Sequence, residues 1–249
     1  MKELIIRADD LGYCEAVNYG IEKTIRYGLV RTVGLMTNTE SAEHGVHLLK
    51  DYDICMGLHV NICDGYPLSN RQNVRSLLQE NGEFKTAGQY RSASEDIVDY
   101  EEALIEVTAQ YKRYVELTGR RPSYIDIHSV SSDNLEAAVK KIAAKEGMDY
   151  LPLRFNEPVC FRGQKLTIHM DSIFPGYDPF ESLKTAVSES SDDSISLMIC
   201  HPGYVDEHLR KTSLLVMQRP AETEMLTSAV TIEWLKNNHV CLITPDQLV

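Results

Sequence analysis

The chain has 249 residues and a formal net charge of −12, with 43% hydrophobic and 25% charged residues. This length allows one large domain with a sizeable core, and α/β barrels often reach it as a single domain. The acidic balance disfavours proteins that track nucleic-acid phosphates and proteins that bind anionic membrane surfaces. We therefore expect neither nucleic acid nor a membrane as a partner.

The N-terminal sequence and the cysteines favour a cytoplasmic location. Met1-Lys2-Glu3 runs directly into LIIRA, which is too short and is charged too early for a signal peptide. No apolar run approaches the roughly 20 residues that span a bilayer. The six cysteines form no CxxC pair, and several lie inside apolar runs. We interpret them as buried free thiols in a reducing compartment.

Short apolar runs alternate with helical patterns in the first half of the chain. The predicted strands are residues 3–8 (ELIIRA), 32–37 (TVGLMT) and 53–60 (DICMGLHV). The predicted helices are residues 15–26, 42–51 and 101–117, the last with Gly119 as its stop. Residues 61–94 are rich in Gly, Asn, Gln, Ser and Arg, which predicts an insertion with one short helix.

The alternation continues in the second half. The predicted strands are residues 123–129 (SYIDIHS), 149–154 (DYLPLR, a weaker pattern), 194–201 (SISLMICH) and 240–244 (VCLIT). The predicted helices are residues 135–145, 180–188 and 221–236. Residues 155–175 are irregular, although 165–174 (KLTIHMDSIF) has the composition of a strand.

This order of elements predicts the fold class. Strands that alternate with helices imply a parallel sheet with right-handed crossovers. About seven such units without a GxGxxG dinucleotide fingerprint favour a barrel over an open doubly wound sheet. We therefore predict a single α/β domain over residues 1–249, a distorted TIM-like barrel with about seven parallel strands.

Acids or imidazoles stand near the carboxyl ends of four predicted strands, and this end is the active face of parallel α/β barrels. They are Asp9 and Asp10, His59, His128 and His201. Two adjacent carboxylates raise each other's proton affinity unless a cation or a reaction uses them. Both aspartates reach the mouth only if the strand is already turning, because successive strand residues point to opposite faces.

One carboxylate and two imidazoles are a plausible open site for a divalent metal, and the second carboxylate would remain as a base. Such a donor set suits zinc, manganese or iron, and magnesium only with several waters. Each residue alone has a simpler interpretation, because an Asp-Asp pair is more often a cap or turn and a lone histidine more often a core residue. The joint pattern favours the metal site.

Four segments, together with a late Arg219 and ITPDQL, resemble the YdjC-like carbohydrate deacetylases: IIRADDLGYCEAVNYGIEKTIRYGLVRTVGLM, MGLHVNICDGYPL, RRPSYIDIHS and ICHPGYVDEHL. The resemblance covers essentially the whole chain. It implies a distorted seven-stranded TIM-like barrel that removes acetyl groups from N-acetylated sugars such as chitooligosaccharides. It also implies one divalent metal ion, magnesium or zinc with manganese or cobalt as alternatives, and a homodimer would fit.

The resemblance also implies a role for individual residues. It assigns Asp10, His59 and His128 as metal ligands, Asp9 as the general base, His201 as the protonated general acid and Arg154 as an arginine near the base. Many relatives have a histidine-rich run after the aspartate at position 126, where this chain has a single imidazole. His128 is therefore the sole ligand candidate on that strand.

Other functions stay open at this point. The same metal could serve an amidohydrolase or phosphoesterase that acts on another small molecule. The barrel could instead be a metal-dependent sugar-binding regulator, in which Asp9 and His201 would be superfluous. Residues 61–94 and 203–218 flank the expected mouth. Tyrosines at positions 66, 90, 177 and 204 could stack on sugar rings there, although ordinary loop aromatics are at least as plausible.

Overall fold

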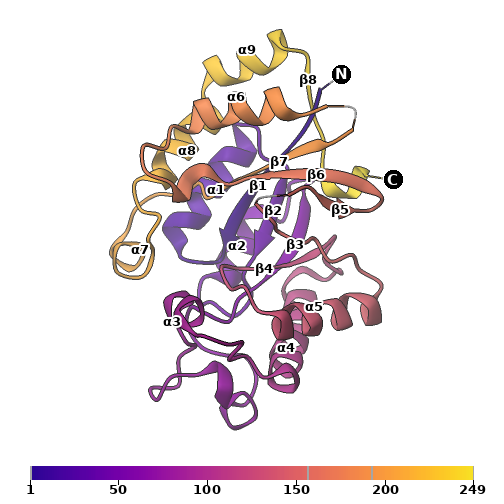
Figure 1. Cartoon of the computed structure of the whole chain (residues 1–249). Coiled ribbons are helices and arrows are strands. Elements are labelled where there is room, and N and C mark those ends of the chain that lie inside the picture. Colours follow the sequence, from indigo (N-terminus) through magenta and orange to yellow (C-terminus); the bar gives the residue numbers. More distant parts are fainter. Residues whose placement is uncertain (1, 156, 192, 249) are drawn as a thin grey trace.

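A curled, mostly parallel sheet runs through the protein, with helices packed around it (Figure 1). The structure is a computed structural model that describes residues 2–155, 157–191 and 193–248. The hydrogen-bonded order of strands is β4-β3-β2-β1-β7-β6-β5, and β8 also pairs with β1. The strands are β1 (Lys2–Leu11), β2 (Thr32–Leu35), β3 (Cys55–Val60), β4 (Ile125–Ile127), β5 (Val159–Phe161), β6 (Gln164–His169), β7 (Ile195–Cys200) and β8 (Val240–Leu242).

The connections between parallel strands are mostly helical, as the sequence predicts. The helices are α1 (Glu15–Arg26), α2 (Ala42–Leu49), α3 (Ala87–Ser92), α4 (Tyr100–Thr118), α5 (Asp133–Glu146), α6 (Pro179–Glu189), α7 (Glu207–Thr212), α8 (Gln218–Thr227) and α9 (Ala229–Asn237). All strand pairs along the order are parallel except β5–β6. The predicted fold class, a distorted barrel-like α/β domain, is confirmed.

Local sequence explains where the helices begin and end. The Asp99 side chain accepts a hydrogen bond from the backbone of Glu102, and α4 ends at Gly119 with φ of 69°. Ser132 caps α5 in the same way, and this helix ends at Gly147 with φ of 67°. Capping oxygens satisfy free N–H groups, and glycine adopts the left-handed conformation at little cost.

The structure differs from the prediction in four places. Residues 149–154 form no strand, because Tyr150 makes only an isolated bridge to Ile125 of β4. In the region described as irregular, β6 agrees with the strand composition noted at 165–174, but β5 and its antiparallel pairing with β6 were not predicted. The helix predicted at 221–236 is two helices, because Ser228 adopts an extended conformation and caps the start of α9. The short helix α7 within residues 203–218 was not predicted.

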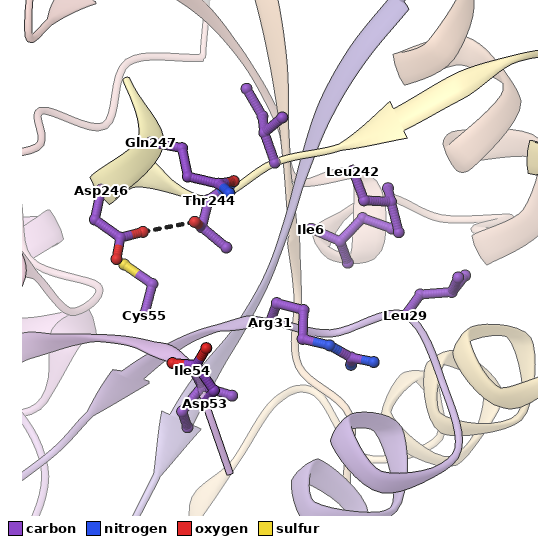
Figure 2. A pocket seen from close by; sticks show the side chains of 11 residues that line it. Ile6, Leu29, Arg31, Asp53, Ile54, Cys55, Leu242, Thr244, Asp246 and Gln247 are labelled. Carbon is purple, nitrogen blue, oxygen red and sulfur yellow. Dashed lines mark hydrogen bonds between the residues drawn. The ribbon is translucent and has the colours of Figure 1, made fainter. Parts of the chain in front are cut away.

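A cavity of about 420 Å³ lies at the end of the sheet where β3 begins (Figure 2). Its lining includes Ile6 of β1, Cys55 at the start of β3 and Leu242 at the end of β8. None of the strand-end acids and histidines singled out in the sequence contributes to this lining. The cavity therefore gives no support to the predicted site, which belongs to the opposite end of β3.

In the part of the chain that the structure describes, no helix combines the length and the apolar character needed to cross a membrane.

Candidate metal centre

The backbone turns at the end of β1, which brings both aspartates to the same end of the sheet. The pairing of β1 with β2 loses its regular register between Ala8 and Leu11. Asp10 adopts a left-handed φ of 71°, and Gly12 has a φ of 98°. The side chains of Asp9 and Asp10 therefore escape the strict alternation of a strand. This is the turn that the sequence required for two adjacent carboxylates to face one mouth.

Three side chains from different strands bring their donor atoms together. Oδ1 of Asp10 lies 3.2 Å from Nδ1 of His128 and 3.7 Å from Nε2 of His59. The two imidazole nitrogens lie 3.1 Å apart. Ligands at about 2.1 Å from a tetrahedral ion are about 3.4 Å from one another. Asp10, His59 and His128 are therefore spaced as a divalent ion would need them.

Asp10 supports this interpretation through its two oxygens. Its Oδ2 accepts a hydrogen bond of 2.7 Å from Arg219, whereas its Oδ1 is buried and has no hydrogen-bond partner. Burial alone raises the pKa of Asp10, but the charges of Arg219 and His128 outweigh burial and hold it well below its ordinary value. A buried, ionised oxygen that lacks a donor suits a cation, and the donor set fits one.

A second carboxylate orients each histidine of the triad. Nδ1 of His59 lies 2.9 Å from Oδ1 of Asp126, which is fully buried on β4. Nε2 of His128 lies 3.2 Å from Oδ2 of Asp64. A carboxylate on one ring nitrogen fixes the tautomer, so that the other nitrogen presents its lone pair to a metal. Each imidazole thus keeps one nitrogen for the centre.

Charge dominates the behaviour of His128 in the metal-free protein. Burial alone lowers its pKa, but the neighbouring Asp10 carboxylate outweighs burial and raises the pKa of His128 well above its usual range. The positive charge of a protonated His128, which its extra proton supplies, therefore takes the place of the charge that a bound cation would bring. Metal binding at this triad has to release that proton.

Arg7 links Asp9 to the ligand network. This fully buried arginine lies on β1, and its two terminal nitrogens are 2.6 Å from Asp9 and 2.8 Å from Asp126. Burial by itself lowers the pKa of Arg7, but the two carboxylates raise this pKa by more than burial lowers it. The guanidinium therefore stays charged. The other oxygen of Asp9, Oδ1, is buried without a hydrogen-bond partner. That oxygen is free to accept a proton.

Gly34 on β2 makes room for the side chains of Asp9 and His59. A Cβ atom there would lie 2.8 Å from Oδ1 of Asp9 and 3.2 Å from Cβ of His59. A side chain at this position would therefore displace one or both groups.

Arg154 does not take the place expected for it. Its exposed guanidinium lies 3.0 Å from Glu136 of α5, and no contact found among the described residues joins it to Asp9. Arg7 occupies the position beside the base instead. The correction has a simple physical reason: Arg154 follows a segment that leaves the sheet after one bridge, whereas Arg7 lies two residues before Asp9 on the same strand.

His201 follows β7 at the same end of the sheet, but its charge state differs from the expectation. Burial lowers the pKa of His201 to about 4, because it outweighs the neighbouring Asp10 carboxylate, which raises the pKa, while the charge of Arg219 acts in the same direction as burial. The imidazole of the unliganded protein is therefore neutral at neutral pH, not protonated. Its Nδ1 is buried without a hydrogen-bond partner.

Glu222 of α8 positions the His201 backbone. One carboxylate oxygen accepts a hydrogen bond of 2.5 Å from the His201 N–H, and the other accepts one of 2.7 Å from the Tyr177 hydroxyl. Burial raises the pKa of Glu222 to about 7. Tyr177 is therefore committed to this contact, which disfavours the stacking role considered for it.

The other loop tyrosines divide between core and surface. Tyr90 is buried, and its hydroxyl donates to the backbone of Ile62 and Leu77. Tyr66 and Tyr204 are exposed, and Tyr66 lies against the guanidinium of Arg71. Tyr66 and Tyr204 alone keep a ring available to a ligand.

Sequence reasoning missed or left open several residues that the structure brings to the centre. Arg7 had a signal, because a charged residue inside the apolar run LIIRA needs a buried partner. Asp126 also had one, because it lies two residues before a predicted ligand on a buried strand. Arg219, Glu222 and Asp64 come from segments distant along the chain from the residues they contact, so local sequence gives no indication of these contacts.

The chain is similar to known proteins over nearly its whole length. The family model described as YdjC-like protein matches residues 3–237. A carbohydrate deacetylase from Geobacillus stearothermophilus is 31% identical, covering 96% of this chain and 95% of its own length. Carbohydrate deacetylase 2 from Listeria innocua is also 31% identical, with 97% of both chains covered.

Solved structures show the same fold. A crystal structure of a candidate cellobiose-phosphate cleavage protein from Enterococcus faecalis V583 has a TM-score of 0.84 at 23% identity, covering 100% of this chain and 99% of that one. A family 4 acetyl xylan esterase from Clostridium thermocellum, solved with a cobalt ion, has a TM-score of 0.53 at 12% identity, covering 99% and 90%.

Proposed function

The chain belongs to the YdjC-like family, and from this premise we propose that it is a metal-dependent hydrolase that removes acetyl groups from N-acetylated sugars or oligosaccharides. The convergence of Asp10, His59 and His128, with Oδ2 of Asp9 3.8 Å from Nε2 of His59, is the observation that carries the proposal. Two relatives named carbohydrate deacetylases support the substrate class. We propose a cytoplasmic homodimer with one resident divalent ion, magnesium or zinc.

Asp10, His59 and His128 would hold the ion. When bound, a divalent ion supplies Lewis acidity, which lowers the pKa of a water molecule and polarises the acetyl carbonyl. Arg7 holds Oδ2 of Asp9, which lies 3.8 Å from Nε2 of His59, and so fixes this carboxylate beside the site. Asp9 then takes one proton from the water molecule while the oxygen of that water attacks the acetyl carbon.

His201 acts on the leaving nitrogen. It is neutral before substrate binds, so it has to gain a proton as negative charge develops on the tetrahedral intermediate, because nearby negative charge raises the pKa of an imidazole. Its protonated ring then donates to the amine nitrogen while the C–N bond breaks. The products are acetate and a free amino sugar. His201 takes its proton from solvent, and Asp9 later returns the proton of the attacking water to solvent, so the protons balance.

The first experiment measures acetate release from N-acetylglucosamine oligomers of increasing length. The metal-free protein is assayed after addition of magnesium, zinc, manganese or cobalt. Metal-dependent release that disappears in Asp9→Asn, while that variant still binds one equivalent of metal, is the expected result. His59→Ala should lose the metal itself. Full activity of Asp9→Asn would remove Asp9 from the mechanism.

A null result from every oligomer, with one equivalent of metal bound, would reject the substrate and keep the site. The remaining alternatives are an amidohydrolase for another small amide and a metal-dependent sugar-binding regulator. Metal-dependent binding of an oligomer without turnover, unchanged in His201→Ala, would favour the regulator.

A further inference from the structure

A second group of metal-ligating side chains lies beside the centre. The ligand atoms of Cys63, Asp64 and His128 all lie within 4.8 Å of one another. Sγ of Cys63 is 3.6 Å from Oδ2 of Asp64, and the same oxygen is 3.2 Å from Nε2 of His128. His128 therefore stands between two groups of donors: its Nδ1 faces Asp10 and its Nε2 faces Asp64.

The turn that carries Cys63 and Asp64 is held rigidly. Oδ1 of the fully buried Asn61 accepts hydrogen bonds from the backbone N–H groups of Cys63 and Asp64, at 2.9 and 3.1 Å. Its Nδ2 donates to the backbone oxygen of Asp64 at 2.8 Å and to Oδ1 of Asn38 at 3.0 Å. Preorganised donors bind an ion at a lower entropic cost than donors on a flexible loop.

We propose that Cys63, Asp64 and Nε2 of His128 form a second cation site, which takes a soft divalent ion such as zinc or cadmium and inhibits the enzyme. Thiolate ligands select such ions, whereas magnesium and manganese prefer oxygen ligands. The site differs from the centre in this respect, because Asp10, His59 and His128 offer no sulfur. The side chains of Asp64 and His128 are 28% and 14% exposed, which leaves the site open to ions from solvent.

Occupancy changes the centre through the shared imidazole. An ion on Nε2 replaces the hydrogen bond to Asp64 that orients the ring, and it adds positive charge next to Nδ1. The ion also displaces the thiol proton of Cys63 and the Nε2 proton of His128 into water. The inhibitory consequence rests on the proposed function, whereas binding of the second ion does not.

Cadmium titration of the metal-free full-length protein tests occupancy. Calorimetry counts bound equivalents, and ultraviolet absorbance reports thiolate-to-cadmium charge transfer. We expect two equivalents in the wild type, with the thiolate band growing as the second one binds. Cys63→Ser should keep the first equivalent, lose the band and weaken the second equivalent by at least the roughly 10–100-fold that loss of an outer-shell partner costs. If serine perturbs the turn, the titration uses Cys63→Ala in place of Cys63→Ser.

Cys160→Ser is the matched control, because Cys160 is an exposed thiol on β5, away from the strand ends that form the centre. It should bind both equivalents and keep the band. A wild type with one equivalent and no thiolate band would overturn the proposal, as would a band that persists in Cys63→Ser.

An activity assay tests inhibition separately. Acetate release by the wild type should rise to one equivalent of zinc and fall when zinc is in excess, whereas Cys63→Ser should reach the same maximum without the fall. Excess manganese should inhibit neither protein. Absence of any acetate release, with two cadmium equivalents and a thiolate band, would refute the proposed substrate and leave the second site intact. Equal zinc inhibition of both proteins would refute the inhibitory role of this site.

Discussion

Replacing Arg219 with methionine tests how the protein tolerates two adjacent buried carboxylates. Arg219 is 2% exposed, and its Nη2 lies 2.7 Å from Oδ2 of Asp10, which is 1% exposed. Breaking a buried ion pair by removing one partner costs about 3–5 kcal/mol, because the remaining charge is left without compensation. For a chain of this size, each kcal/mol shifts the melting temperature by about 2–4 °C. We therefore expect the metal-free variant to melt about 6–20 °C below the wild type.

A bound cation should reduce this loss, because it compensates the same carboxylate. Thermal unfolding is measured with a chelator and again with saturating zinc, and the difference between wild type and Arg219→Met should be smaller with zinc. Arg210→Met is the control, because Arg210 forms an exposed pair with Glu207, and such pairs contribute about 0–1 kcal/mol. If Arg219→Met and Arg210→Met have the same melting temperature in the presence of the chelator, the reasoning is refuted.

Three further changes test the rest of the site. Burial raises the pKa of Glu222 from 4.5 to about 7, so its proton stabilises the fold fully below about pH 4.5, and this contribution is lost as the pH rises through 7. Urea unfolding should be measured at pH 5 and at pH 8. Between these pH values the free energy of unfolding should fall by about 3 kcal/mol less in Glu222→Gln than in the wild type, and equal losses would contradict the buried acid. Gly34→Ala should lower both metal affinity and turnover, because the added methyl group would contact Asp9 and His59. Wild-type values in calorimetry and in the acetate assay would mean that strand β2 shifts to accommodate the methyl group without affecting the site. Arg154→Ala should leave kcat essentially unchanged in the same acetate assay, since an exposed ion pair is worth about 0–1 kcal/mol, and a large loss would return Arg154 to the mechanism.

Most of the fold could be predicted from periodicity and termination signals. The bounds of α1 agree with the prediction, and α4 ends at the predicted Gly119. The errors lie where tertiary contacts override local pattern. Residues 149–154 are apolar enough for a strand but meet β4 at a single bridge, and the helical pattern of 221–236 continues past Ser228, where the backbone breaks.

The sequence by itself determined which side chains stand at the strand ends, because the hydrophobic runs that form the sheet stop at these residues. The pattern alone gave the strand-end acids and histidines as candidates, and the resemblance to the YdjC-like family selected Asp10, His59 and His128 among them before any distance was known. Only the tertiary structure decided what holds them in place. Arg219 meets Asp10 from a helix 209 residues away, and Asp64 meets His128 from a loop. Such pairings depend on how the elements pack in three dimensions, and no local periodicity in a sequence encodes that packing.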